Sequence, residues 1–204
     1  MVLIQYILEM ARTREFDRTL VLRKAVHVFW SRGFDSTNLP ELLESMGLSK
    51  SSLYETFGDK EKLFEEALDL YAKEIAASKL EKLLNASSVK GGFQAFFAEQ
   101  IRCCTDKKYP GGCFMANTAV SLDNVPPALA KKIRKSVEQS HGVFLSQIQK
   151  GQKAGEISRY KDASALASAV IGTSMGMTVM ARVNREDVRT LEQMVETTMN
   201  SIFS

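Results

Sequence analysis

The three cysteines of this chain are its side chains with the greatest potential for covalent chemistry, and Cys113 has the most favourable position. It opens a segment that we expect to be helical, and Lys107 and Lys108 closely precede it. A helix N-terminus and nearby cations favour the thiolate, which is the nucleophilic form. Cys103 and Cys104 are adjacent, which is no zinc-ligand spacing; one could serve as a resolving thiol, but a place on a helix face explains them more simply. Because free cysteines are among the most buried residues, a core position is also the plainer interpretation of Cys113.

The remaining side chains offer no catalytic or metal-binding pattern. His27 and His141 are far apart in sequence, and neither has a metal-ligand spacing or a recognisable nucleophile beside it. The glycine pairs at 91–92 and 111–112 lack the surrounding residues of a phosphate-binding loop. We therefore expect a protein that is not an enzyme and that has no metal site and no cofactor. Three cysteines are also too few for a disulfide framework, which favours a reducing cytoplasm.

A short segment, residues 50–57, carries the other side chains suited to binding. Only Leu53 and Phe57 belong to a buried helical stripe, so the remaining side chains point elsewhere. Hydroxyl groups, a lysine and a tyrosine near a helix N-terminus suit phosphate oxygens and base edges in the major groove of DNA. The alternative is a solvated surface helix that binds nothing.

The elements around this segment predict a helix-turn-helix. Apolar residues at helical spacing indicate one helix over residues 18–32 and another over residues 38–46. Gly47 suits the left-handed residue that ends a helix, and Ser49 suits the cap of the next helix. Trp30 is large enough to fill the centre of the resulting three-helix core.

The same region contains an ordered series of residues: Gly33-Phe34, Thr37, the run Gly47-Leu48-Ser49-Lys50-Ser51-Ser52-Leu53-Tyr54, Phe57, and the restart Lys60-Glu61-x-Leu63-Phe64. In order and spacing this series, within residues 14–70, resembles the DNA-binding domain of the TetR/AcrR family of bacterial regulators. The resemblance implies an all-α fold, with an N-terminal three-helix helix-turn-helix domain and a C-terminal helical domain for ligand binding and dimerisation.

The resemblance also implies roles for individual side chains. Those expected in the major groove are Lys50, Ser51, Ser52, Glu55 and Thr56. Those expected on phosphates are Thr37, Tyr54 and Lys60. Glu55 has two interpretations, because it could accept a hydrogen bond from a cytosine amino group or pair with a nearby lysine.

The charge of the chain permits an anionic partner without demanding one. Its net charge is +3 and its pI is about 8.7. Residues 11–62 contain nine Lys/Arg against eight Asp/Glu, so this region is not basic as a whole. We expect local attraction to DNA from Arg14, Lys50 and Lys60. Positive charge is concentrated early in the chain, where it suits an arm that touches phosphates, at Arg12, Arg14, Arg18, Arg23 and Lys24.

Apolar periodicity predicts further helices to the end of the chain. A helix over about residues 60–76 should link two domains, residues 10–62 and 63–204, with a boundary zone at residues 77–90. Later helices are expected over residues 93–104, from 113 onward, and over 128–154, 162–182 and 186–203.

Aromatic and methionine side chains on these helices would give adaptable walls to a ligand pocket between them. Most of these side chains are equally consistent with plain core. The candidate lining residues are Phe93, Phe97, Cys113, Phe114, Asn117, Phe144, Met175 and Met177. The arrangement of Gly112-Cys113 and Asn117 also resembles a branch of the family in which a cysteine here is common and some members sense electrophiles or oxidants.

Residues 163–181 contain no charged side chain, which on length alone would allow a membrane span. Their Ser, Thr, Gly and Ala content favours a helix buried inside a protein. The small-residue edge of this helix and the apolar face of the last helix predict a homodimer through the last two helices. The N-terminal MVLIQYILEM lacks a basic leading region, so we expect no signal peptide, and whether residues 1–9 are native stays open.

These patterns together predict a cytoplasmic, ligand-responsive transcriptional regulator, most simply a repressor. Its dimer would bind a palindromic double-stranded operator and would be released by a small-molecule or electrophile effector. An enzyme and a purely structural helical dimer are the alternatives, and an activator would use the same DNA-binding parts.

Overall fold

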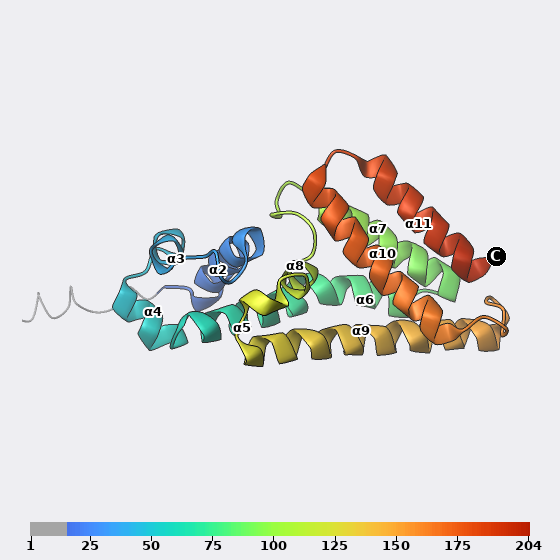
Figure 1. Cartoon of the computed structure of the whole chain (residues 1–204), viewed down its shortest axis with the longest axis horizontal. Helices are drawn as coiled ribbons and strands as arrows, with labels where there is room; N and C mark the ends of the chain where they lie inside the picture. Colours follow the sequence, from blue (N-terminus) through green and yellow to red (C-terminus); the bar gives the residue numbers. More distant parts are fainter. Residues whose placement is uncertain (1–15) are drawn as a thin grey trace, which may run out of the picture.

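Helices joined by short turns make up the described chain, residues 16–204, in this computed structural model. No strand occurs within that range, and the all-α prediction is confirmed. Figure 1 shows an elongated arrangement, with α2, α3 and α4 at one end and α7, α10 and α11 toward the other. The helices α5, α6 and α9 run along the molecule and join the two groups.

The helices of the first group begin and end where their capping residues predict. They are α2 (Arg18–Arg32), α3 (Leu39–Met46) and α4 (Lys50–Phe57). Gly47 lies between α3 and α4 in the left-handed region, with φ 69° and ψ 32°, a conformation that glycine adopts without strain. The side chain of Ser49 then accepts a hydrogen bond from the first turn of α4. The turn of the helix-turn-helix is therefore short and sharply specified.

An apolar core holds α4 against the helices around it. Phe29 of α2 is fully buried and meets Phe64 edge to face, with ring centroids 4.8 Å apart. Leu42 and Leu53 close the same core from α3 and α4. Phe57 is 3% exposed, so both apolar side chains of α4 are anchored. Burying a side chain of this size stabilises a fold by about 1.5–3 kcal/mol, which is enough to orient so short a helix.

One continuous helical run links the two groups of helices. It consists of α5 (Lys60–Tyr71), a π-helical segment (Ala72–Ala76) and α6 (Ala77–Leu84). The predicted end of the linking helix at residue 76 was wrong, because Leu83 continues the buried stripe in α6. A π-helical segment inside a helix often marks a functional site, and this one lies midway along the run.

Helix α7 (Val89–Thr105) begins earlier than the predicted helix over residues 93–104. Gly91 and Gly92 lie in its first turn, which the side chain of Ser88 caps. A Cβ atom at Gly92 would stand 2.5 Å from the carbonyl oxygen of Leu83. Glycine is therefore required here by the close approach of α6 and α7.

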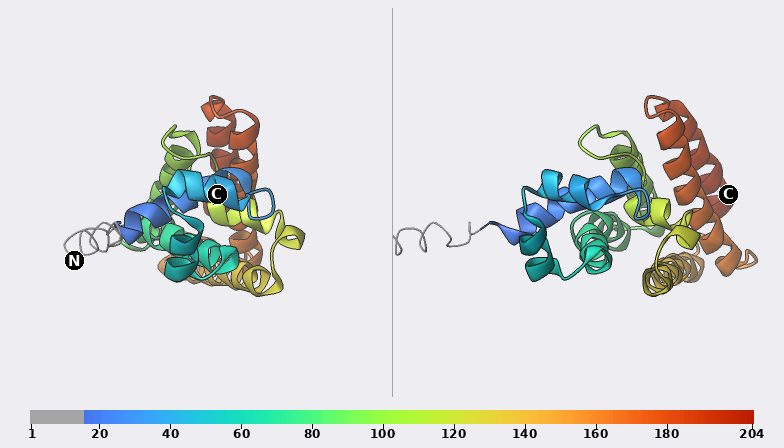
Figure 2. Two further views of the ribbon diagram at one scale, coloured as in Figure 1. Left: turned by 90° about the vertical axis from the view of Figure 1, so that its left-hand side faces the viewer. Right: turned by 60° about the vertical axis from the view of Figure 1, so that its left-hand side comes forward.

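The remaining helices agree with their predicted ranges to within a few residues. They are α8 (Phe114–Ala119), a short 3-10 turn (Leu122–Asn124), α9 (Pro127–Ala154), α10 (Ala163–Val183) and α11 (Val188–Phe203). In Figure 2, α10 and α11 lie side by side at the far end of the molecule from α4.

Helix α10 presents much of its apolar surface to solvent in the single chain. By length and composition α10 could cross a membrane, because its mean hydropathy reaches 1.4 over an 18-residue window. Only 22% of that window is buried within the single chain. Core helices of soluble proteins can have the same length and hydropathy, so these two properties alone are weak evidence of a membrane span. Its exposed side contains a stripe at helical spacing that runs through Ala165, Ala169, Gly172, Val179 and Val183. Within residues 16–204 nothing covers this stripe, so the predicted burial of the helix would need the second subunit of the predicted dimer.

Candidate nucleic-acid interface and ligand pocket

The outward face of α4 is polar and open. Lys50, Ser51 and Glu55 are exposed, and Tyr54 is 46% exposed despite its size. Ser52 and Thr56 are half-buried at the edges of this face. The sequence-predicted groove residues thus share one surface, and a positive charge stands at the first position of the helix.

Hydroxyl groups gather at the N-terminus of α4. The Oγ atom of Ser49 accepts a hydrogen bond from the backbone N–H of Ser52 at 3.1 Å. It also lies 2.9 Å from the hydroxyl oxygens of both Ser51 and Ser52. A helix N-terminus carries partial positive charge, and the hydroxyls add donors for an anionic oxygen.

Lys60 and Thr37 flank α4 but differ in their surroundings. The ammonium of Lys60 lies 4.4 Å from the ring centroid of Phe34, and partial burial lowers its pKa. Thr37 is 1% exposed, and its hydroxyl donates to the carbonyl of Gly33 at 2.6 Å. Its side chain therefore serves the core, and the structure does not place its hydroxyl where a phosphate would reach it.

Two of the early arginines hold α2 against the linking helix. Arg18 pairs with Glu66 of α5 at 2.7 Å, and Arg23 pairs with Glu74 of the π-helical segment at 2.7 Å. Their charges are already partnered, so the expected phosphate-binding role does not follow for them. Arg14 lies outside the described residues, as does Arg12.

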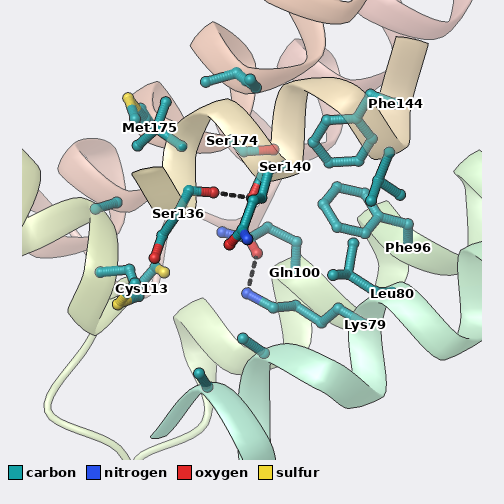
Figure 3. Close-up of a pocket in the computed structure, with 18 of the residues that line it drawn as sticks. Lys79, Leu80, Phe96, Gln100, Cys113, Ser136, Ser140, Phe144, Ser174 and Met175 are labelled. Atoms are coloured by element: carbon teal, nitrogen blue, oxygen red, sulfur yellow. Dashed lines mark hydrogen bonds between the residues drawn. The ribbon is translucent and has the colours of Figure 1, made fainter. Parts of the chain in front are cut away.

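A cavity of about 340 Å³ lies in the C-terminal group of helices, within the range of small-molecule sites. Side chains from α6, α7, α8, α9, α10 and the π-helical segment line it. Its walls are mostly apolar, and Figure 3 shows Leu80, Phe96 and Phe144 gathered on one side.

The structure separates the predicted pocket residues into two groups. Cys113, Phe144 and Met175 line the cavity. The others lie elsewhere because their helices turn these side chains into the packed core or the preceding loop. Those in the core are Phe93, Phe97, Phe114 and Met177, each at most 1% exposed, while Asn117 donates to the carbonyl of Gly111 at 3.3 Å.

The polar side chains of the cavity were not anticipated from the sequence. Lys79 of α6 and Gln100 of α7 meet at 2.7 Å, and the other polar lining residues are Ser136, Gln139, Ser140 and Ser174. Lys79 was missed because it fell in the predicted boundary zone. A lysine on the buried side of an amphipathic helix, in line with Leu83, was the available signal.

Cys113 stands between the cavity and the helix-turn-helix. It is the N-cap residue of α8, it is partly exposed, and it lines the cavity. The buried hydroxyl of Tyr71 donates to its Sγ atom at 3.1 Å, and burial raises the pKa of that phenol well above its usual value. Cys103 and Cys104 are buried, and burial raises the pKa of the Cys104 thiol to about 12. Of the three thiols, Cys113 alone is accessible.

The loop before Cys113 contacts the first helix directly. The indole N–H of Trp30 in α2 donates to the carbonyl of Gly111 at 3.1 Å. Arg182 of α10 donates to the carbonyl of Ser31 at 3.3 Å. These contacts join the cavity region to the helix-turn-helix through a route separate from the linking helix.

A helix-turn-helix with an exposed polar second helix, joined to a helical body that contains a cavity, defines a class of DNA-binding transcriptional regulators. A family model described as "Bacterial regulatory proteins, tetR family" matches residues 21–67, and one described as "Tetracyclin repressor-like, C-terminal domain" matches residues 92–197. The chain belongs to the TetR family. Proteins of this family are dimeric and bind double-stranded DNA and small-molecule effectors.

Relatives and solved structures agree with this assignment. The chain is 35% identical to the HTH-type transcriptional repressor ComR of Escherichia coli, over 84% of this chain and 82% of ComR. It is 30% identical to the transcriptional regulator YezE of Bacillus subtilis, over 87% and 92% of the two chains. A cysteine-substituted CifR, complexed with 26-bp double-strand operator DNA, superimposes with a TM-score of 0.85 at 28% identity, covering 94% of this chain and 99% of CifR.

Proposed function

We propose that the protein is a repressor whose dimer binds a palindromic operator through α4 of each subunit and leaves it when a ligand enters the cavity. The exposed polar face of α4, fixed from behind by Leu53 and Phe57, carries the proposal. A short rigid helix with such a face suits the major groove. The operator-bound state of CifR, a similar protein, supports the same use of this fold here.

Dimerisation through α10 and α11 would set the distance between the two α4 helices. The small residues in the exposed stripe of α10, Ala169 and Gly172 among them, allow two helices to approach closely. Covering the stripe would also bury Val179 and Val183, which are 47% and 76% exposed in the single chain. A two-fold axis at this face would present the two recognition helices to successive major grooves.

The cavity is placed to shift α4. Ala72 and Ala76 of the π-helical segment line it, so an occupant would press on the linking helix itself. Cys113 lines it as well, and the loop before Cys113 contacts Trp30. In this proposal a ligand favours a spacing of the recognition helices that no longer fits the operator.

We assign residues 10–62 to DNA binding and residues 63–204 to ligand binding and dimerisation. The boundary falls inside α5, whose Leu63 and Phe64 are fully buried in the core of the helix-turn-helix. The run from α5 to α6 thus belongs physically to both domains, which suits a transmitting element. The protein acts in the cytoplasm, where its operator is, and it catalyses no reaction.

An electrophile is the second candidate effector, favoured by the accessibility of Cys113. Alkylation of Sγ would add bulk between the cavity wall and Tyr71, next to the loop that contacts α2. The test is operator release by N-ethylmaleimide, compared in the wild type and in Cys113→Ser. Release that persists unchanged in Cys113→Ser would remove Cys113 as the sensor.

Selection of random duplex DNA by the purified protein tests the proposed function. The expected result is a palindromic sequence whose half-sites are about one helical turn apart, bound with a steep salt dependence. Enrichment of no sequence, or binding that is insensitive to salt, would contradict operator recognition.

A further inference from the structure

The ammonium group of Lys79 is buried at the wall of the cavity without a counter-charge. Lys79 is 6% exposed, and its Nζ atom donates to the neutral amide oxygen of Gln100 at 2.7 Å. Within residues 16–204, no carboxylate lies within 4.0 Å of it. An ammonium has three N–H donors, and burying a charge is costly unless it is paired. The remaining donors of Lys79 therefore need an acceptor that this part of the chain does not supply.

The ionisable groups around Lys79 do not provide the missing negative charge. Both carboxylate oxygens of Glu99 are occupied, one by Lys82 and the other by Arg102. The thiols of Cys103 and Cys104 are buried, and burial raises the pKa of each, so both stay neutral near neutral pH. The positive charge at the cavity wall is therefore uncompensated.

A second polar group of the cavity also lacks a partner. The hydroxyl oxygen of Ser174, on α10, is buried and has no hydrogen-bond partner within the described chain. The hydroxyls of Ser136 and Ser140 already donate to backbone carbonyls of α9. Figure 3 shows Lys79 and Gln100 reaching toward these serines, while Leu80, Phe96 and Phe144 line one side. The cavity thus has a polar region with unused donors and an adjacent apolar wall.

We propose that the cavity takes an amphipathic organic anion, whose carboxylate pairs with Lys79 and whose apolar body lies against Phe96 and Phe144. The rings of Phe96 and Phe144 meet edge to face with centroids 5.1 Å apart and are almost fully buried. This assignment rests on the proposed function, in that the cavity is the effector site. It adds the chemical class of the effector: an acid with a small hydrophobic tail.

Octanoate and octan-1-ol are matched probes, because they share an eight-carbon chain and differ in the charged head. Their affinities for the full chain are measured by isothermal titration calorimetry for the wild type, Lys79→Met and Lys73→Met. Lys73 is exposed and does not line the cavity, so it controls for the loss of a nearby lysine. A hydrogen bond to a charged group changes an affinity by about 10- to 100-fold, so octanoate should bind the wild type and Lys73→Met at least about tenfold more tightly than octanol. Lys79→Met should lose that preference.

Equal affinities of the two probes for the wild type, or a preference for octanoate that survives in Lys79→Met, would overturn the proposal, as would octanoate that does not bind. A thermal melt verifies the fold of each variant, and Lys79→Gln replaces Lys79→Met if the latter does not fold. Operator binding without a probe is measured in parallel. Absence of the octanoate preference in the wild type, with intact operator binding, rejects only the anion, whereas failure to bind any operator rejects the regulator itself.

Discussion

Thr37 shows how a residue expected at the interface can instead support it from behind. Its hydroxyl closes the turn after α2 by donating to the carbonyl of Gly33, and the side chain is buried. That turn sets the direction in which α3 starts, and hence the position of α4. Its contribution to DNA binding would then be indirect, through the stability of the helix-turn-helix.

Thr37→Val is expected to lower the free energy of unfolding by about 1 kcal/mol, because it removes the donor of a partly buried carbonyl. The salt dependence of operator binding should not change, because no phosphate contact is lost. Urea denaturation and binding titrations at several salt concentrations measure the two effects. A shallower salt slope at unchanged stability would mean that Thr37 contacts phosphate after all.

The ionised carboxylate of Glu99 is expected to stabilise the C-terminal helices, and this stabilisation should be lost at acid pH. Its hydrogen bonds with Arg102 and Lys82 lower the pKa of its carboxyl from 4.5 to about 2. Because the folded pKa lies below the ordinary value, the contribution is present above about pH 4.5 and is lost as the pH falls toward 2. Unfolding by urea at pH 6, 4.5 and 3 should show a smaller loss of stability in Glu99→Gln than in the wild type. Parallel pH profiles would contradict this role of Glu99.

Among the elements, the junction of α6 and α7 depends most strictly on a single residue. Gly92→Ala would bring a Cβ atom to 2.5 Å from the backbone carbonyl of Leu83. Overpacking of this kind typically costs about 1–3 kcal/mol. Gly142→Ala is the matched control, because its Cβ would meet nothing within 4 Å and the helix α9 would gain about 0.5–1 kcal/mol. Thermal or urea melts should therefore move in opposite directions for the two variants, and a stabilising Gly92→Ala would refute the close approach.

The bounds of the first three helices could be predicted because each has a local signal. Ser49 caps α4 and Gly47 ends α3, and each of these residues directly adjoins the helix whose end it sets. The junction at Gly92 could not be predicted, because glycine is needed there only by the close approach of another helix, α6, and not by any local signal. The pocket residues divide in the same way. Aromatic content identified Phe144, but which aromatic side chains face the cavity depends on helix rotation, and Lys79 was missed because its helix was ended too early.

At the scale of the whole molecule, the exposed stripe of α10 is the surface that the proposed dimer would cover. Ala169→Glu would place a charge in the middle of the proposed dimer interface and is expected to shift the protein toward monomers. Gln149→Glu makes a similar change at an exposed position of α9, outside that stripe, and should leave the dimer intact. Sedimentation velocity measures both. A stable Ala169→Glu dimer would place the interface elsewhere.

Operator binding by a variant of the α4 face tests the central claim most directly. Affinity for the selected duplex is measured by fluorescence anisotropy for Lys50→Ala with Tyr54→Ala. The control is Lys153→Ala with Tyr160→Ala, which removes the same side-chain types from exposed positions in the last turn of α9 and in the turn that follows it. We predict a loss of about 1–3 kcal/mol or more in binding free energy for the first variant, at unchanged stability, and no loss for the control. Undiminished operator binding by the α4 variant would show that α4 is not the recognition helix.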